Sequence, residues 1–288
     1  MNMQHSWIFV PGQAQRMVDK ALGLAADVIM LDLEDSVVPA QKATARALVK
    51  KAIGRPKLPG SPTRYVRING VGLSDCQLDL EAVVQPGLEG VVVPKMESIE
   101  QVRWLEEILT RLELSRRMKQ GTVMLMLAIE SPRALISSSA LASSSPRVSG
   151  LMFGAEDFSR ALNLPTVRRG PARDLLYARS QIVVAAAAAG VASVDGVWPD
   201  LEDRAGLEED CAYSRALGFT GKSLIHPAQI EPINRAFRPT DTELAFARKV
   251  VAEFEKAVGA GTGSIAVEGQ LVDAPIYERA KTTLRKVQ

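Results

Sequence analysis

The fold of this chain is decided by the stretch Val123-Met124-Leu125-Met126-Leu127-Ala128-Ile129-Glu130. Seven apolar residues follow one another without a break and end at a carboxylate. A continuous apolar run of this length is typical of a strand that is buried on both faces, as in a parallel sheet. In an eight-stranded barrel of alternating strands and helices, the carboxyl ends of the strands carry the active site. We therefore expect Glu130 to lie at the mouth of such a barrel and not in its core.

A second stretch repeats this pattern, since Gly150-Leu151-Met152-Phe153-Gly154 is followed by Ala155-Glu156-Asp157. Because neighbouring parallel strands end at the same rim, the two stretches would deliver acids to one place. Two carboxylates plus water molecules are the usual protein ligands of Mg²⁺, with positions left for substrate oxygens. We predict a hard-metal site formed by Glu130 and one acid of the second stretch, and spacing alone leaves both Glu156 and Asp157 open. The alternative for Glu130 is a buried ion pair with Arg67 or Lys95.

Apolar stretches with strand character alternate eight times with stretches of helical spacing along the chain. The predicted strands are residues 6–10, 27–31, 64–69, 88–93, 123–129, 150–154, 193–198 and 219–225. Such alternation favours a parallel α/β fold, and eight units favour closure into a barrel over an open sheet. We predict a TIM (β/α)8 barrel over residues 1–236 and a C-terminal helix and module over residues 237–288. Within the barrel, the serine-rich residues 137–145 are predicted to form a poorly packed helix end or loop at the surface.

Composition excludes several classes of protein. The chain has 288 residues, of which 47% are hydrophobic and 24% are charged, as is typical of a globular enzyme. Its net charge is only +2 and the basic residues are scattered, so we expect no nucleic-acid partner. Cys76 and Cys211 have no CxxC spacing and fit a reduced, cytoplasmic protein. We see no signal peptide at the start, and the longest run of small apolar residues, 182–192, is too short to cross a bilayer.

Ionisable and polar side chains follow most of the predicted strands, whereas the opposite strand ends carry far fewer. They are Asp32, Glu34, Asp35, Arg67, Asn69, Lys95, Glu130, Glu156, Asp157, Asp200 and His226. In a barrel these side chains converge on one rim, which is the asymmetry that an active site requires. The chain contains two histidines and no His/Cys cluster suited to zinc, so oxygen ligands and Mg²⁺ are favoured. It also lacks the Gly-rich phosphate loops and the GxSxG motif of serine hydrolases.

Several of these rim residues have two interpretations. Asp32, Glu34 and Asp35 either bind metal or pair with the rim cations and cap the next helix, and we favour the second role. In one interpretation, Arg67 binds a carboxylate through two parallel hydrogen bonds or stabilises an enolate oxygen. In the other, it forms a structural ion pair with Glu34 or Asp35. Lys95 has the same ambiguity, with the structural role favoured.

The remaining candidates are Arg16, Lys20 and His226. Arg16 and Lys20 are four residues apart on a predicted helix, so they share one face. There they either meet the phosphates of a long ligand or are solvated. His226 ends the last predicted strand, and a lone histidine in such a position is more often structural than catalytic.

Eight blocks of sequence resemble the citrate lyase beta subunit-like family, which includes malyl-CoA and citramalyl-CoA lyases. The blocks are Ser-Trp-Ile-Phe-Val-Pro-Gly (6–12), Leu-Asp-Leu-Glu-Asp-Ser-Val (31–37), Val-Arg-Ile-Asn-Gly (66–70), Val-Pro-Lys-Met-Glu (93–97), Ala-Ile-Glu-Ser-Pro (128–132), Phe-Gly-Ala-Glu-Asp-Phe (153–158), Gly-Lys-Ser-Leu-Ile-His-Pro (221–227) and Val-Asp-Ala-Pro-Ile (272–276). They cover nearly the whole chain in the order of that family. The resemblance implies a TIM barrel, a Mg²⁺ cofactor and an acyl-thioester substrate.

The resemblance also implies a role for individual residues. Glu130 and Asp157 would be the metal ligands, and Arg67 would hold the substrate and the enolate that it becomes. Asp273 would move a proton, because it matches an acid that the C-terminal module of residues 237–288 brings over the barrel of a neighbouring subunit. This implies a homo-oligomer, a trimer or a hexamer. The residues that match coenzyme A contacts are Phe9, Arg16 and Lys20, and those that match the pocket lining are Glu156, Ile225 and His226.

The function implied is a Mg²⁺-dependent carbon–carbon lyase that cleaves a 3-hydroxyacyl-CoA thioester to acetyl-CoA and a 2-oxo acid. Citramalyl-CoA and malyl-CoA are the expected types of substrate. The alternatives are a citrate lyase beta subunit that acts on an acyl carrier protein, a malyl-CoA thioesterase, and a non-catalytic barrel. The complete set of Arg67, Glu130, Asp157 and Asp273 argues against the last alternative, and Arg16 with Lys20 favours free coenzyme A.

Overall fold

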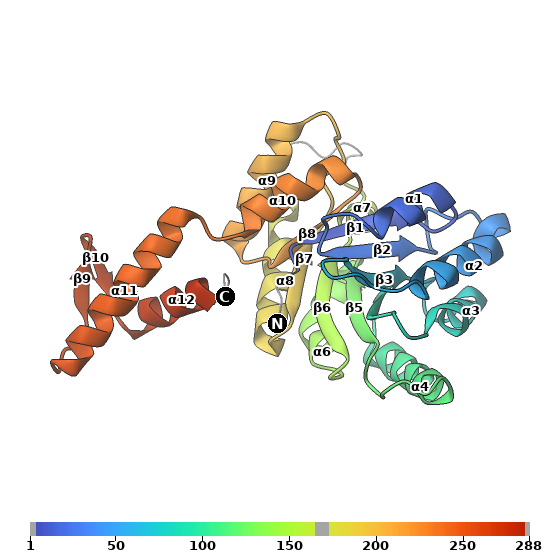
Figure 1. Cartoon of the computed structure of the whole chain (residues 1–288), viewed down its shortest axis with the longest axis horizontal. Helices are drawn as coiled ribbons and strands as arrows, with labels where there is room; N and C mark the ends of the chain where they lie inside the picture. The colour runs from blue at the N-terminus through green and yellow to red at the C-terminus, as the bar shows by residue number, and fades with distance from the viewer. Residues whose placement is uncertain (1–3, 165–172, 286–288) are drawn as a thin grey trace. The chain divides into compact units, whose positions relative to one another are not determined.

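Eight parallel strands close into a barrel in the computed structural model, which describes residues 4–164 and 173–285 (Figure 1). The strands are β1 Ser6–Pro11, β2 Val28–Asp32, β3 Thr63–Arg67, β4 Gly90–Val93, β5 Met124–Ile129, β6 Val148–Phe153, β7 Ala192–Asp195 and β8 Gly221–Leu224. They pair in sequence order, and β8 pairs with β1 to complete the ring. The predicted TIM barrel is therefore confirmed.

Helices follow the strands and cover the outside of the barrel (Figure 1). They are α1 Gln15–Ala21, α2 Lys42–Ile53, α3 Ser74–Val83, α4 Ile99–Ser115, α5 Pro132–Ile136, α6 Ser138–Ala142, α7 Ala155–Ala161, α8 Leu176–Ala189, α9 Arg204–Leu217 and α10 Ile230–Phe237. Three short 3-10 helices join them: η1 Pro39–Gln41, η2 Arg173–Leu175 and η3 Pro227–Gln229.

The barrel interior explains why the strands read as continuous apolar runs. Inward side chains from neighbouring strands form one buried cluster: Trp7, Val28, Met30, Tyr65, Val92, Met126, Met152 and Val194. Successive side chains of a strand point to opposite faces. Met126 points into the barrel, so Ala128 and Glu130, two and four residues later, also lie on the inner face of β5. Leu127 and Ile129 are buried as well, but they face the helices. This alternation carries Glu130 to the inside of the rim.

The serine-rich residues 137–145 are better packed than the sequence predicted. They contain α6, in which Ser138, Leu141 and Ala142 are buried. α6 packs against α8, where small side chains allow the two helices to approach closely. The prediction of a poorly packed surface segment was wrong, because local polarity does not reveal this long-range contact.

The C-terminal part of the chain forms a second compact unit, with the boundary between Asn234 and Arg235. It contains α11 Asp241–Gly259, the antiparallel pair β9 Ile265–Val267 and β10 Gln270–Val272, and α12 Ala274–Arg285. It has its own core, in which the rings of Phe254 and Tyr277 stack with centroids 4.9 Å apart. The predicted reach toward a neighbouring subunit stays a prediction. Across residues 4–164 and 173–285, no helix combines the length and apolar composition that a membrane crossing needs.

Candidate active site

The carboxyl ends of the barrel strands surround a cavity of about 500 Å³. Its floor is apolar and its rim is acidic. The floor includes Val92, Ala128, Met152, Phe153 and Val197, and the rim includes Asp32, Asp35, Arg67, Glu130, Glu156 and Asp157. Of the strand-end side chains predicted to gather on one rim, those that line this cavity are Asp32, Asp35, Arg67, Glu130, Glu156 and Asp157.

Glu130 is fixed in this rim by its neighbours. It is only 7% exposed, and its Oε2 accepts a hydrogen bond of 2.9 Å from the backbone N–H of Lys95. Gly154, at the end of β6, makes room on the other side, because a Cβ there would overlap the Glu130 side chain. Residues 4–164 and 173–285 contain no ion pair between Glu130 and Arg67 or Lys95. The contact with Lys95 runs instead through the backbone.

The pKa of Glu130 is raised to about 7, chiefly by burial and next by the nearby Glu34 carboxylate. The N–H of Lys95 and the charge of Arg67 lower this pKa without cancelling the effect, while Asp157 adds a second carboxylate repulsion. A buried carboxylate with this much uncompensated charge is stabilised by a nearby cation.

Asp157 lies in the first turn of α7 and lines the same cavity as Glu130. Its Oδ1 accepts a hydrogen bond of 2.6 Å from Nη2 of Arg160, whose side chain is 76% exposed. An exposed pair of this kind contributes little to stability, so a metal ion can compete for the carboxylate. Glu156 also lines the cavity but is exposed.

The two carboxylates fit Mg²⁺ better than they fit a metal that requires a full protein cage. Among the residues that the structure describes, no group of three or more His, Cys, Asp or Glu side chains is placed to hold a metal. Mg²⁺ is commonly bound by one or two carboxylates and keeps its remaining positions for water or substrate.

Arg67 ends β3 and is held by acids from β2 and the residues after it. Its Nε and Nη2 donate to Oδ1 and Oδ2 of Asp32, both at 2.7 Å, and its Nη1 lies 3.0 Å from Oε2 of Glu34. The register of the barrel places Asp32 directly beside Arg67. The guanidinium also lies over the Phe9 ring, 4.8 Å from its centroid.

The charges of this cluster stabilise one another. Burial alone would lower the pKa of Arg67, but Asp32 and Glu34 raise it above its ordinary value. Burial raises the pKa of Asp32, and the Arg67 guanidinium more than offsets this and lowers it. Arg67 is therefore a cation, and Asp32 an anion, at neutral pH. The ion pairs with Glu34 and Asp35, which were one of the two interpretations of Arg67, are present, but sequence reasoning missed Asp32, which accepts two hydrogen bonds from it.

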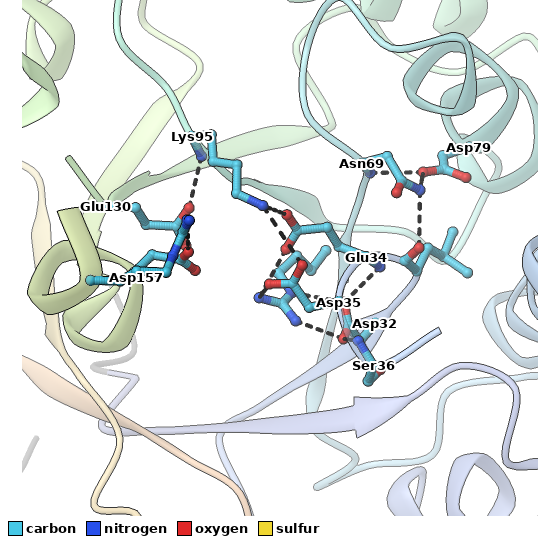
Figure 2. Close-up of polar contacts among 12 residues, drawn as sticks. Asp32, Glu34, Asp35, Ser36, Asn69, Asp79, Lys95, Glu130 and Asp157 are labelled. Carbon is cyan, nitrogen blue, oxygen red and sulfur yellow. Dashed lines mark hydrogen bonds and ion pairs between the residues drawn. The ribbon is translucent and has the colours of Figure 1, made fainter. Parts of the chain in front are cut away.

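A hydrogen-bond network behind the rim holds the acids in place, and Figure 2 shows Asn69 and Asp79, which belong to it. Nζ of Lys42, on α2, donates to the backbone oxygens of Leu33 and Glu34 at 2.7 and 2.9 Å, and to Oδ1 of Asn69 at 2.6 Å. The Asn69 amide in turn donates to Oδ2 of Asp79 at 2.6 Å. Sequence reasoning missed Lys42 and Asp79, since only Asn69 stands at a strand end.

The structure brings together some of the predicted site residues and leaves others apart. Those that line the cavity are Phe9, Arg67, Glu130, Glu156, Asp157 and Ile225. Arg16 and Lys20 are exposed on α1, and Met17 between them lines the cavity instead. His226 is exposed beside the cavity, where its Nδ1 accepts the N–H of Ala228 at 3.2 Å.

Asp273 belongs to the C-terminal unit and begins α12. Its Oδ1 accepts the N–H of Ile276 at 3.3 Å, which is the arrangement of a helix cap. The roles predicted for Asp273, Arg16, Lys20 and His226 stay predictions.

This geometry defines a class of protein: TIM barrels that carry two carboxylates and a partly buried arginine at the carboxyl ends of their strands. A model of the HpcH/HpaI aldolase/citrate lyase family matches residues 5–227, and the chain belongs to this family. It is thus an enzyme of the aldolase/citrate lyase superfamily.

Relatives and solved structures support this assignment. The chain is 37% identical over 283 residues to the citrate lyase subunit beta of Leuconostoc mesenteroides subsp. cremoris, covering 98% of this chain and 93% of the relative. It is 33% identical over 284 residues to a (3S)-malyl-CoA thioesterase of Cereibacter sphaeroides, covering 98% and 94%. Its structure resembles that of CitE from Mycobacterium tuberculosis in complex with magnesium, acetoacetate and coenzyme A. The TM-score is 0.80, the identity is 33%, and 99% of each chain is covered.

Proposed function

We propose that this protein is a Mg²⁺-dependent carbon–carbon lyase that cleaves a 3-hydroxyacyl-CoA thioester, of the citramalyl-CoA or malyl-CoA type. The products are acetyl-CoA and a 2-oxo acid. The observation that carries this proposal is the placement of Glu130, Asp157 and Arg67 around one cavity. The relative of known structure that binds magnesium and coenzyme A supports it.

Glu130 and Asp157 would hold the metal, since both line the cavity and Glu130 carries uncompensated charge. When bound, Mg²⁺ supplies Lewis-acid polarisation of the hydroxyl or keto oxygen next to the substrate carboxylate. Apart from this, the protein must orient the thioester, spread the charge of the enolate and deliver one proton.

Arg67 is the residue that faces the developing enolate. Cleavage breaks the bond between the hydroxyl-bearing carbon and the carbon next to the thioester carbonyl, and the electron pair moves onto the thioester as an enolate. A fixed cation in a partly buried site stabilises such charge without having to reorganise. Asp32 fixes the Arg67 guanidinium through two hydrogen bonds, so the cation is oriented before substrate binds.

Asp273 would complete the reaction by protonating the enolate carbon, which yields the methyl group of acetyl-CoA. The hydroxyl proton passes to solvent water as the 2-oxo acid forms, and Asp273 takes a proton back from water, so atoms and charge balance. We place this Asp273 on a neighbouring subunit of a homo-oligomer, a trimer or a hexamer, in the cytoplasm. Phe9, Arg16 and Lys20 are assigned to coenzyme A, and Ile225 and His226 to the pocket wall.

Two of the relatives point to alternative functions, one as a citrate lyase subunit and the other as a malyl-CoA thioesterase. Purified protein with Mg²⁺ is incubated separately with citramalyl-CoA, malyl-CoA and a citryl thioester, and the products are separated by chromatography. Acetyl-CoA together with pyruvate or glyoxylate is the expected result. Free malate and coenzyme A from malyl-CoA, or oxaloacetate from the citryl thioester alone, would replace the lyase proposal by the corresponding alternative.

A further inference from the structure

Lys95, just after β4, has a backbone conformation that is rare for its residue type. Its φ is +53°, in the left-handed region that favours glycine. The other described non-glycine residues with positive φ are Arg117, Asn163 and Glu268, which lie after α4, after α7 and in the turn between β9 and β10. Left-handed residues are ordinary at helix ends and hairpin turns. Lys95 instead directly contacts Glu130, which lines the active-site cavity, and backbone strain beside such a site often serves function.

The unusual backbone of Lys95 directs its N–H at Glu130. The hydrogen bond to Oε2 of Glu130 is 2.9 Å long, while Gly154 leaves space for the rest of that side chain. In the described part of the chain, no residue donates a hydrogen bond to the second oxygen, Oε1. Glu130 is thereby held through one oxygen, and the other is left for a cation.

The side chain of Lys95 points the other way, toward the acids that hold Arg67. Its Nζ lies 2.6 Å from Oε1 of Glu34 and 3.7 Å from Oδ1 of Asp35. Figure 2 shows Lys95 between Glu130 on one side and the Glu34 and Asp35 carboxylates on the other. The Glu34 side chain is 6% exposed and also pairs with Arg67. Lys95 is therefore the link between Glu130 and the Arg67 cluster.

We infer that Lys95 is a positioning residue, whose backbone N–H orients Glu130 for the metal and whose ammonium holds that backbone in place by binding Glu34. This rests on the proposed metal site of Glu130 and Asp157. Lys95 does not itself line the cavity, so it acts through Glu130 and not by contact with substrate. Removing a group that orients a metal ligand in this way typically costs about 10- to 100-fold in metal affinity.

The two parts of this inference are separated by substitutions at Lys95. Lys95→Met removes the ammonium and keeps a side chain that disfavours positive φ. Lys95→Gly also removes the ammonium, but glycine adopts positive φ without strain, so the N–H can stay directed at Glu130. Lys95→Arg keeps a cation within reach of Glu34. The matched control is Lys57→Met, which removes a lysine bound to Glu89 at the opposite end of the barrel.

The test is the binding of Mn²⁺, used as a paramagnetic probe, to the full chain by electron paramagnetic resonance, with kcat and KM measured alongside. We expect Lys95→Met to raise the Kd about tenfold and to lower kcat, with KM for the thioester unchanged. Lys95→Gly is expected to bind within about threefold of wild type, and Lys95→Arg and Lys57→Met as wild type. A merely structural loss would harm the glycine variant at least as much as the methionine variant.

Two results would overturn the inference: a Kd for Lys95→Met equal to that of wild type, or a Kd for Lys95→Gly as weak as that of Lys95→Met. The midpoint of thermal unfolding, measured for each variant after chelator has removed the metal, shows whether the variant has folded. If Lys95→Met fails to fold, Lys95→Gly is compared with Lys95→Arg. A Kd about tenfold or more weaker for Lys95→Gly than for Lys95→Arg would then overturn the inference. Failure of wild type itself to bind Mn²⁺ would mean that the proposed metal site, and not the role of Lys95, is wrong.

Discussion

At the scale of single residues, the rim is held by charges that are matched in pairs, with one exception. Arg67 is paired with Asp32 and Glu34, and each partner stabilises the charged form of the other. Glu130 is the exception, because within residues 4–164 and 173–285 the hydrogen bond to its buried carboxylate comes from the backbone N–H of Lys95 alone. Since an unmatched buried charge is costly, this carboxylate is neutralised either by a proton, as its raised pKa allows, or by a cation, which is the role of the metal in the proposed function.

Asp32→Asn is predicted to lower kcat. It replaces one of the two carboxylate oxygens that accept hydrogen bonds from Arg67, and these two bonds orient the guanidinium. Misplacing a catalytic group by small distances typically costs about 100-fold in rate, so we expect a loss of about 10- to 100-fold. KM for the thioester should change little, since Asp32 supports a group that acts in the transition state. Steady-state kinetics measure both values.

Asp35→Asn is the matched control for this substitution. Asp35 lies 3.8 Å from Arg67 and its side chain is 55% exposed, so its ion pair is weak. Equal kcat values for the two variants would show that Asp32 does not orient Arg67.

At the scale of elements, strand register brings side chains together that the sequence cannot pair. Continuous apolar runs made β2 and β5 predictable, because a strand buried on both faces leaves that pattern. The partnership of Asp32 with Arg67 was not predictable, since it follows from the pairing of β2 with β3 in one register. The same holds for Lys42, which contacts Asn69 from a helix and leaves no local signal.

A second set of elements is joined by a buried charge network on the other side of the barrel. Asp195, at the end of β7, contacts Arg179 of α8 and lies 3.3 Å from Nζ of Lys222 in β8. Asp210 of α9 binds the same two cations at 3.1 and 2.6 Å. Two strands and two helices are thus tied by buried charges that do not line the active-site cavity.

This network is predicted to make stability fall in acid. Burial raises the pKa of Asp195, but Lys222 and Arg179 outweigh it and lower the pKa to about 2. Because the folded pKa lies below the unfolded value of 3.8, this contribution is complete above about pH 4 and is lost as the pH falls toward 2. Its size is about 2 kcal/mol at neutral pH.

The measurement is the free energy of unfolding by urea at pH 7, 4 and 3 for wild type and Asp195→Asn. Breaking a buried pair costs about 3 kcal/mol or more, so the variant should be clearly less stable at pH 7. The difference between the two proteins should shrink at pH 3. A difference that stays constant from pH 7 to pH 3 would show that Asp195 carries no charge-dependent stability.

At the scale of the whole molecule, the chain has two compact units, and the predicted residues are divided between them. The metal site and Arg67 lie in the barrel, whereas Asp273 lies in the C-terminal unit. The proposed function requires both, and it assigns the second to a neighbouring subunit. Composition and motifs give no oligomeric state, so this part of the account depends on the resemblance and on experiment.

Mixing two inactive variants is predicted to restore activity. Asp273→Ala lacks the proton donor and Glu130→Gln lacks a metal ligand, so each alone should lose nearly all activity. If subunits exchange residues across their interface, hybrids contain some sites with both Glu130 and Asp273 intact. We expect the activity of unfolded and co-refolded mixtures to rise well above that of either variant, toward about a quarter of wild type for equal amounts. No gain in mixtures whose hybrid assembly is verified by mass spectrometry would place Asp273 in its own barrel or outside the reaction.

The central claim is that Glu130 and Asp157 hold one divalent cation, and calorimetric titration of the chelator-treated protein with Mg²⁺ tests it most directly. We predict one site per chain in wild type, and a loss of affinity of at least about 100-fold in both Glu130→Gln and Asp157→Asn. Glu156→Gln, which removes the adjacent acid of α7, should bind within about threefold of wild type. Unchanged binding in the Glu130 and Asp157 variants, or full activity of wild type in chelator, would contradict the account.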